Sequence, residues 1–157
     1  MRIGSTSYIY PADILPNVEQ LAGTVDDIEL VLFEVDEYGS NLPDADTIRR
    51  LRALAEEHGF TYTVHLPLDL RLADDGSPAH ASLDKARRVI ERTRALVPWG
   101  YVLHLNGEAL LGQPTAEGIR RWQAQARRSL EIVSGWLDDP AQLCLENIER
   151  WDHVHVR

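Results

Sequence analysis

The sequence has one cysteine, no excess of positive charge and no long apolar run, and each absence excludes a class of protein. Cys144 alone cannot form a disulfide within the chain, and its apolar neighbours indicate a buried structural thiol. The net charge of −9 argues against nucleic-acid and membrane-surface partners, which select basic faces. No run approaches the ~20 apolar residues of a transmembrane helix, and no apolar signal segment follows Met1. We therefore expect a cytoplasmic protein that acts on a small molecule.

The composition is that of an ordinary globular domain. The chain has 157 residues, of which 44% are hydrophobic and 26% are charged, enough for one domain with a core of its own. We expect a single domain over residues 1–157, with a ragged terminal tail from about residue 148.

Two kinds of segment alternate along the chain. Short runs rich in β-branched and aromatic residues predict strands, and longer runs with apolar residues at helical spacing predict helices. The strands are expected at residues 2–9, 27–35, 61–66, 101–105 and 143–147, and the helices at about 12–23, 43–59, 81–96 and 115–136. This alternation indicates right-handed βαβ units, and therefore an α/β fold with a parallel sheet whose apolar strands are covered on both faces.

Two architectures are compatible with this order of elements, an open doubly wound sheet and a closed (βα)8 TIM barrel. An open dinucleotide-binding sheet requires a glycine-rich phosphate loop after the first strand, and the segment 4–8 (GSTSY) contains no such motif. Each predicted strand ends instead in a polar residue, which is how the active sites of TIM barrels are built. The sequence therefore favours the barrel.

The polar residues at the ends of the predicted strands are the candidate site. They are Ser7 and Tyr8, Glu34, His65, His104 with Asn106, and Glu146 with Asn147. In a parallel barrel all of them would lie at one rim, where imidazole and carboxylate ligands could converge on a divalent metal ion.

The residue types suggest a role for each position. His65, His104 and Glu146 are predicted metal ligands, for zinc, manganese, cobalt or iron equally. Glu146 is also a catalytic candidate, because a carboxylate in an apolar strand needs a cation or donors, and Glu34 is a second one. The substrate-binding candidates are Ser7, Tyr8, Asn106 and Asn147. The competing interpretation is structural, with histidines bonded to backbone and asparagines capping turns.

Seven segments of the chain carry a resemblance to a known family. They are residues 3–9, 11–18, 25–34, 40–43, 62–69, 102–105 and 145–147. Together they resemble the xylose isomerase-like TIM barrels, a superfamily that includes endonuclease IV and many sugar phosphate isomerases. Within it they are most similar to the cobamide-remodelling phosphodiesterases, over residues 2 to about 148.

This resemblance implies a metal-dependent phosphodiesterase that hydrolyses the nucleotide loop of a cobamide. His65 and His104 would be metal ligands, Glu146 a ligand or bridging carboxylate, and Glu34 would bind substrate or steer the attacking water. A metal ion suits this chemistry because it polarises a phosphoryl oxygen and activates water near neutral pH. Two alternatives stay open: a sugar phosphate isomerase or epimerase on the same scaffold, and a non-catalytic fragment that binds a corrinoid or a partner half-barrel.

The length of the chain has a further consequence. A complete barrel of this type needs ~250 residues, so five predicted strands amount to a truncated barrel. The first and fifth strands would then present unpaired edges, and we expect self-association through them.

Overall fold

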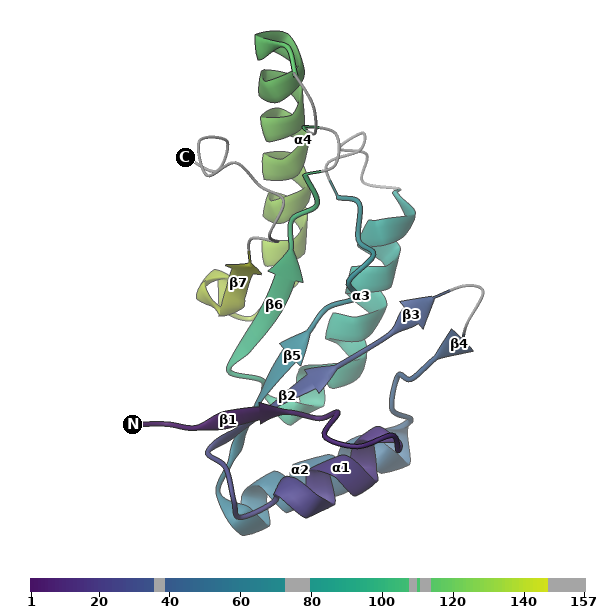
Figure 1. Cartoon of the computed structure of the whole chain (residues 1–157), viewed down its shortest axis with the longest axis vertical. Coiled ribbons are helices and arrows are strands. Elements are labelled where there is room, and N and C mark those ends of the chain that lie inside the picture. Colours follow the sequence, from purple (N-terminus) through teal and green to yellow (C-terminus); the bar gives the residue numbers. More distant parts are fainter. Residues whose placement is uncertain (36–38, 73–79, 108–109, 111–113, 147–157) are drawn as a thin grey trace.

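A computed structural model of the chain describes residues 1–35, 39–72, 80–107, 110 and 114–146. Its strands and helices alternate as the sequence predicts (Figure 1). The strands are β1 (Gly4–Thr6), β2 (Asp27–Val31), β3 (Glu34–Val35), β4 (Gly39–Ser40), β5 (Thr61–His65), β6 (Gly100–His104) and β7 (Leu143–Glu146). The helices are α1 (Ile14–Leu21), α2 (Ala45–His58), α3 (Ala81–Thr93) and α4 (Ala116–Ser134), with short 3-10 turns at Arg94–Leu96 and Pro140–Gln142.

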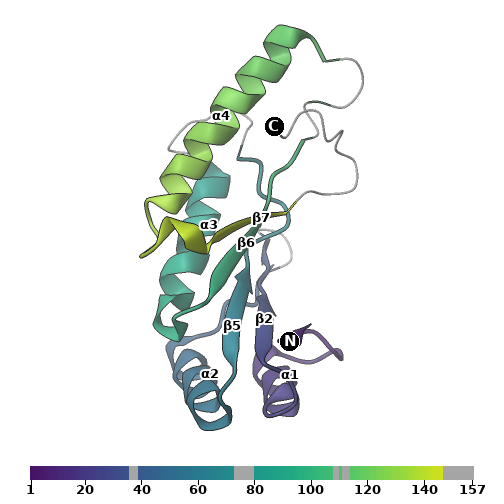
Figure 2. The same ribbon diagram turned by 90° about the vertical axis from the view of Figure 1, so that its left-hand side faces the viewer.

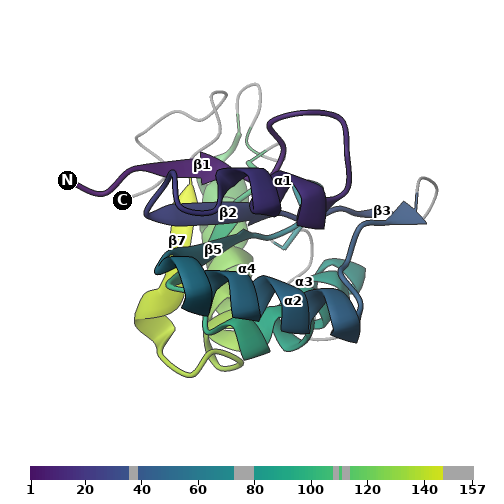
Figure 3. The ribbon, with the colours of Figure 1, turned by 90° about the horizontal axis from the view of Figure 1, so that it is seen from below.

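Five of the strands form one parallel sheet in the order β1-β2-β5-β6-β7. Helices α2, α3 and α4 lie on the same side of this sheet (Figure 2). Seen from below, β1 lies at the outer edge beside β2, with β5 next to it (Figure 3). The predicted α/β fold with a parallel sheet is confirmed.

The hydrophobic core lies between the sheet and the helices. Every second residue of the strands belongs to this core, for example Leu30, Val64 and Leu103. The helices contribute residues such as Leu51 of α2 and Val89 of α3 to the same core. All five of these side chains are fully buried. Burial of this set removes much of the apolar surface of the strands and helices from water, which is the main driving force for folding.

The face of the sheet opposite the helices is more polar than the sequence predicts. The residues between the core positions include Asp27, Glu29, Thr61 and Thr63, none of which is buried. The prediction that the strands are apolar on both faces is therefore wrong for β2 and β5. Along these two strands apolar and polar residues alternate, with Val31 at the end of β2 as the exception, so one face packs against the helices and the other is free to carry polar groups.

The ends of the helices follow from local hydrogen bonding. The Asp44 side chain accepts a bond from the backbone N–H of Thr47 and caps α2, and this bond lowers the pKa of the Asp44 carboxyl. Gly59 ends the same helix in the left-handed conformation, with φ of 73°. The Thr115 hydroxyl caps α4 by accepting from Gly118 N–H.

The predicted strand over residues 27–35 is in fact two strands. Parallel pairing stops at Val31, because the side chain of Asn41 bonds the backbone beyond this point. The side-chain NH2 of Asn41 donates to the Val31 carbonyl, and its side-chain carbonyl accepts from Phe33 N–H. Glu34 and Val35 then pair antiparallel with Ser40 and Gly39. This small hairpin was not predicted, since the apolar pattern of the sequence runs through Phe33 without a break.

The predictions for the end of the chain and for the outer strands are not tested by the described residues. Asn147 and the expected tail lie outside the described residues. β1 and β7 are the outer strands of the described sheet, and self-association through their edges stays a prediction. Within the described residues, no helix has the length and apolar character needed to cross a membrane.

Candidate metal centre

The strand register brings three predicted ligands to one end of the sheet. His104 and Glu146 are direct partners on β6 and β7, and His65 is the partner of Val102, two residues before His104. His65 and His104 belong to the face of the sheet opposite the helices, because they alternate with the core residues Val64 and Leu103. Glu146 shares this face because it is in register with His104. We call His65, His104 and Glu146 the metal triad.

The ligand atoms of the triad form a small triangle. Glu146 Oε2 lies 3.0 Å from His104 Nε2 and 3.7 Å from His65 Nε2, and the two Nε2 atoms are 3.2 Å apart. A point equidistant from these three atoms lies about 1.9 Å from each, close to the ~2.0–2.2 Å typical of zinc bonds to imidazole nitrogen and carboxylate oxygen. The three side chains therefore fit one divalent ion with little movement.

The backbone fixes the tautomer of His65. Its Nδ1 lies 2.7 Å from the carbonyl oxygen of Leu66, which can only accept, so Nδ1 carries the proton. In the neutral ring Nε2 then carries the lone pair, and this atom lies 3.2 Å from His104 Nε2 and 3.7 Å from Glu146 Oε2. Metal-bound histidines commonly donate their second ring N–H to such a carbonyl, which orients the ring and makes it a better ligand.

The two rings of the triad hold each other in position. The His65 and His104 rings pack edge to face, with centroids 4.7 Å apart and planes at 86°. His65 is buried, at 8% exposure, whereas the Glu146 side chain is 56% exposed. The centre is therefore walled by imidazoles on one side and open on the Glu146 side, where a small molecule can approach.

The triad also has a consistent arrangement of protons without an ion. The close contact between the two Nε2 atoms requires a proton on one of them, and a proton on His104 Nε2 meets this requirement when His65 is neutral. That proton can be donated to His65 or to Glu146, 3.0 Å away. A metal ion would displace it, since ligands bind metals in their deprotonated form.

Comparisons with known proteins identify the architecture. No protein-family model matches the chain, and no curated protein matches it in sequence. Three solved structures cover 96% of the chain: a D-tagatose 3-epimerase-like protein (18% identity, TM-score 0.70), a D-psicose 3-epimerase (19%, 0.69) and the D-psicose 3-epimerase of Clostridium cellulolyticum H10 (17%, 0.60). The chain shares its fold with about half of each of these structures, and the prediction of a partial TIM barrel is confirmed.

The likeness to these structures is one of fold, because the identities are below 20%. The chain also spans only about half the length of the solved structures that it matches, at 54%, 53% and 53% of theirs. The described residues supply five parallel strands and the helices packed on them.

Glu34 lies apart from the triad in its interactions. Its carboxylate accepts a hydrogen bond from the Ser40 hydroxyl and lies 3.6 Å from the guanidinium of Arg88 on α3. These contacts tie the β3–β4 hairpin to α3. The structure thus gives Glu34 a structural explanation, and its catalytic role stays a prediction.

The predicted substrate-binding residues occupy different environments. Ser7 is buried, and its hydroxyl accepts a bond from Val31 N–H, which extends the pairing of β1 with β2. Tyr8, the next residue, is exposed. Asn106 follows β6 and accepts a bond from the indole N–H of Trp122 on its backbone carbonyl. Asn147 lies outside the described residues, and substrate binding by the other three stays a prediction.

The burial of Cys144 and of Asn17 differs from what the sequence predicts. Cys144 is half-buried instead of buried, because its register with Val102 places it on the face of the sheet opposite the helices. Asn17 is completely buried and bonds the loop after β1, a role that was not foreseen. A polar residue beside Val18 on the apolar side of the first helix was the signal that could have found it.

Proposed function

We propose that this chain forms part of the active site of a metal-dependent sugar isomerase or epimerase of the xylose isomerase-like type. The observation that carries the proposal is the metal triad, whose three ligand atoms lie around a point at metal-bond distance. The choice of reaction is supported by the fold, since the similar solved structures are named as ketose 3-epimerases.

The three residues of the triad would have different roles in the reaction. A bound divalent ion would polarise an oxygen of the substrate and stabilise the charge that develops on it. His65 and His104 would hold the ion as neutral ligands, with His65 oriented by the Leu66 carbonyl. Glu146 Oε2 faces the histidines, and its exposed side chain leaves the second oxygen available to accept a proton from substrate or water.

The test begins with metal binding by the purified chain. Cobalt(II) bound through imidazole and carboxylate gives a visible absorption band, and zinc should displace the cobalt competitively. We expect His65→Ala, His104→Ala and Glu146→Gln each to weaken cobalt binding at least tenfold, since each removes one of three ligands. His58→Ala is the matched control, because His58 lies at the end of α2, away from the triad. Unchanged affinity in all three triad variants would contradict the proposed centre.

Turnover is tested next with the same preparation. Cobalt-, manganese- or zinc-loaded chain is incubated with D-fructose or D-tagatose, and epimers are separated by chromatography. Formation of a C3 epimer that is lost in Glu146→Gln supports the isomerase or epimerase. A metal-loaded, folded preparation that leaves both ketoses unchanged speaks against these substrates.

A second candidate is the phosphodiesterase of cobamide remodelling. Its support is the run of seven sequence segments, which includes the residues around His65, His104 and Glu146. The same triad suits it, because a metal centre can also activate water towards a phosphodiester. Release of a cobinamide phosphate from a cobamide, followed by mass spectrometry and lost in His104→Ala, would favour it. Corrinoid binding without any product would favour the non-catalytic alternative.

A further inference from the structure

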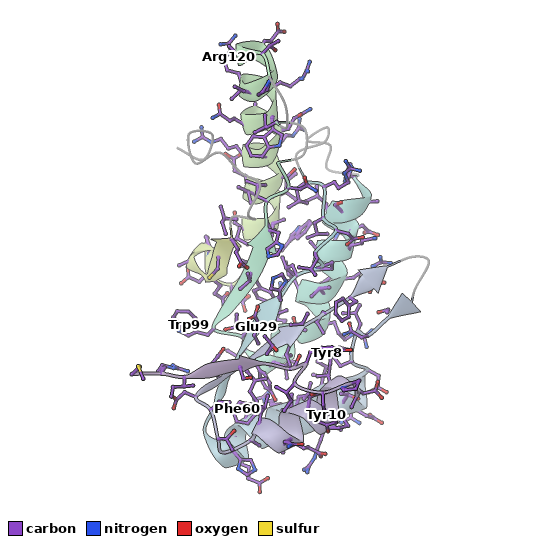
Figure 4. The ribbon with its side chains drawn as sticks, viewed as in Figure 1. Tyr8, Tyr10, Glu29, Phe60, Trp99 and Arg120 are labelled. Carbon is purple, nitrogen blue, oxygen red and sulfur yellow. The ribbon has the colours of Figure 1, made fainter. Side chains whose placement is uncertain are left out.

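Four arginines lie on one face of α4, the helix whose first turns project past the ends of the strands (Figure 4). They form two pairs, Arg120 with Arg121 and Arg127 with Arg128, and Ala124 lies midway between the pairs. All five residues are exposed. The chain as a whole carries a net charge of −9, so this concentration of positive charge is a local exception that calls for an explanation.

The sequence of this face is palindromic about Ala124. The arginines lie three and four residues before Ala124 and three and four residues after it, and Glu117 and Glu131 lie seven residues away on either side. Positions separated by three, four and seven residues share one face of an α-helix. This face is therefore a short basic surface with a small side chain at its centre and a carboxylate at each end. We call these seven residues the arginine face.

The fold of the chain does not use the arginine face. The buried residues of α4 lie on the opposite side of the helix and are Trp122, Ala126, Ser129 and Val133. Among the described residues, Arg127 pairs with Glu131 of the same helix at 3.3 Å, and the other three arginines have no ion pair. An exposed pair of this kind contributes at most about 1 kcal/mol. The stability of the chain therefore does not explain the two arginine pairs.

The order of charges on the arginine face favours one class of partner. A second copy aligned on Ala124 would place arginines against arginines and glutamates against glutamates, because the palindrome is the same in both directions. A nucleic-acid backbone is negative along its whole length and would meet Glu117 and Glu131 at the two ends of the face. The complementary partner has acidic groups opposite the arginines and basic groups opposite the two glutamates.

We propose that the arginine face binds an α-helix of another protein that carries the complementary pattern. Such a helix has a small residue at its centre, acidic residues three and four positions to either side, and a lysine or arginine seven positions out. The small side chain of Ala124 lets the two helix axes approach to about 8 Å, the close end of the usual range for packed helices. The matched charges then fix the position of one helix along the other.

The test uses two peptides of the same composition. A stapled helical peptide of about 15 residues carries the complementary pattern, and in the reference peptide the same residues are spread around the helix. Binding to the purified chain is measured by fluorescence anisotropy. We expect the patterned peptide to bind at least about tenfold more tightly than the reference. In about 1 M sodium chloride, where the screening length is about 3 Å, this preference should disappear.

Two variants of the arginine face separate charge from shape. Arg120→Glu combined with Arg128→Glu should weaken binding of the patterned peptide about tenfold, because each change replaces an attraction by a repulsion. Ala124→Leu alters no charge and should also weaken binding, since the larger side chain holds the two helices apart. Circular dichroism first shows that each variant keeps its helices.

The matched controls lie on α2, which also has exposed arginines and an exposed alanine. Arg49→Glu combined with Arg52→Glu changes the net charge by the same amount, and Ala53→Leu matches the change in shape. Both controls should bind the patterned peptide as the wild type does. Equal binding of the two peptides, unchanged binding in the variants of the arginine face, or a single-stranded oligonucleotide bound as tightly as the patterned peptide would each overturn the inference.

Discussion

The loop after β1 depends on one buried side chain, and its removal is the perturbation with the clearest expected effect. Asn17 accepts bonds from Ile9 N–H at 2.9 Å and Tyr10 N–H at 3.2 Å. Its amide donates to the carbonyl groups of Tyr10, Ala12 and Asp13 at 3.3, 3.1 and 2.9 Å. Asn17→Ala would remove all five bonds at once.

The cost can be estimated from the groups that lose a partner. A carbonyl oxygen has two lone pairs and tolerates the loss of one donor better than an N–H group tolerates the loss of its acceptor, so the loss at the carbonyls of Tyr10, Ala12 and Asp13 costs little. The two N–H groups face the completely buried Asn17 position and lose their acceptor, at about 1–1.5 kcal/mol each. A small cavity in α1 adds to this. We expect Asn17→Ala to lower the free energy of unfolding by about 3 kcal/mol, a large effect for one substitution.

Urea denaturation followed by circular dichroism measures this change. Gln20→Ala, which truncates an exposed amide on the same helix, is the control and should change the free energy of unfolding by less than about 0.5 kcal/mol. Cobalt should still bind to Asn17→Ala, because Asn17 lies outside the metal triad. A loss below about 1 kcal/mol would show that Asn17 does not organise the loop.

Three other predictions follow from single contacts. Tyr62→Phe removes the hydroxyl that donates to the Leu51 carbonyl at 2.8 Å in the core, and should cost about 1 kcal/mol in urea denaturation. Because burial raises the pKa of Tyr62 above its ordinary value of 10.0, wild-type stability should fall as the pH rises above 10.0, and Tyr62→Phe should lose less. The lowered pKa of Asp44 means that its capping stabilises the chain above the ordinary carboxyl pKa of 3.8, so the deficit of Asp44→Ala should shrink as the pH falls through the lowered value. Zinc at 100 times its dissociation constant should stabilise the chain by about 2.7 kcal/mol in thermal denaturation, and at the same zinc concentration the tenfold weaker binding of His104→Ala should reduce this gain to about 1.4 kcal/mol or less.

The secondary structure could be predicted where the sequence carries strong local signals. The helix over residues 45–58 has a capping aspartate before it and a glycine after it, and its predicted bounds differ from the observed ones by only a residue or two. The first strand was predicted over residues 2–9 but spans only Gly4–Thr6, because Ser7 uses its side chain in the next bond of the ladder. Such a substitution of side chain for backbone leaves no trace in hydrophobic periodicity.

The candidate site could be predicted only in part. Strand ends that carry histidine or glutamate point to one rim once the sheet is parallel, and the structure brings His65, His104 and Glu146 together. Glu34 has the same sequence context, yet it pairs with Ser40 and Arg88 in a hairpin that depends on Asn41. The difference lies in a tertiary hydrogen bond, which the sequence pattern does not contain.

The direction of each candidate histidine ligand is set by the core on the other side of the same strand. In β5, Tyr62 and Val64 are buried beneath the helices, and this obliges Thr63 and His65 to face the other way. A shift of the strand by one residue would turn His65 towards the helices and Val64 away from them, at the cost of the whole apolar face. The same holds in β6, where burial of Leu103 turns His104 towards Glu146. The metal triad is therefore positioned by hydrophobic burial as much as by its own contacts, so substitutions such as Val64→Thr should weaken metal binding without touching a ligand.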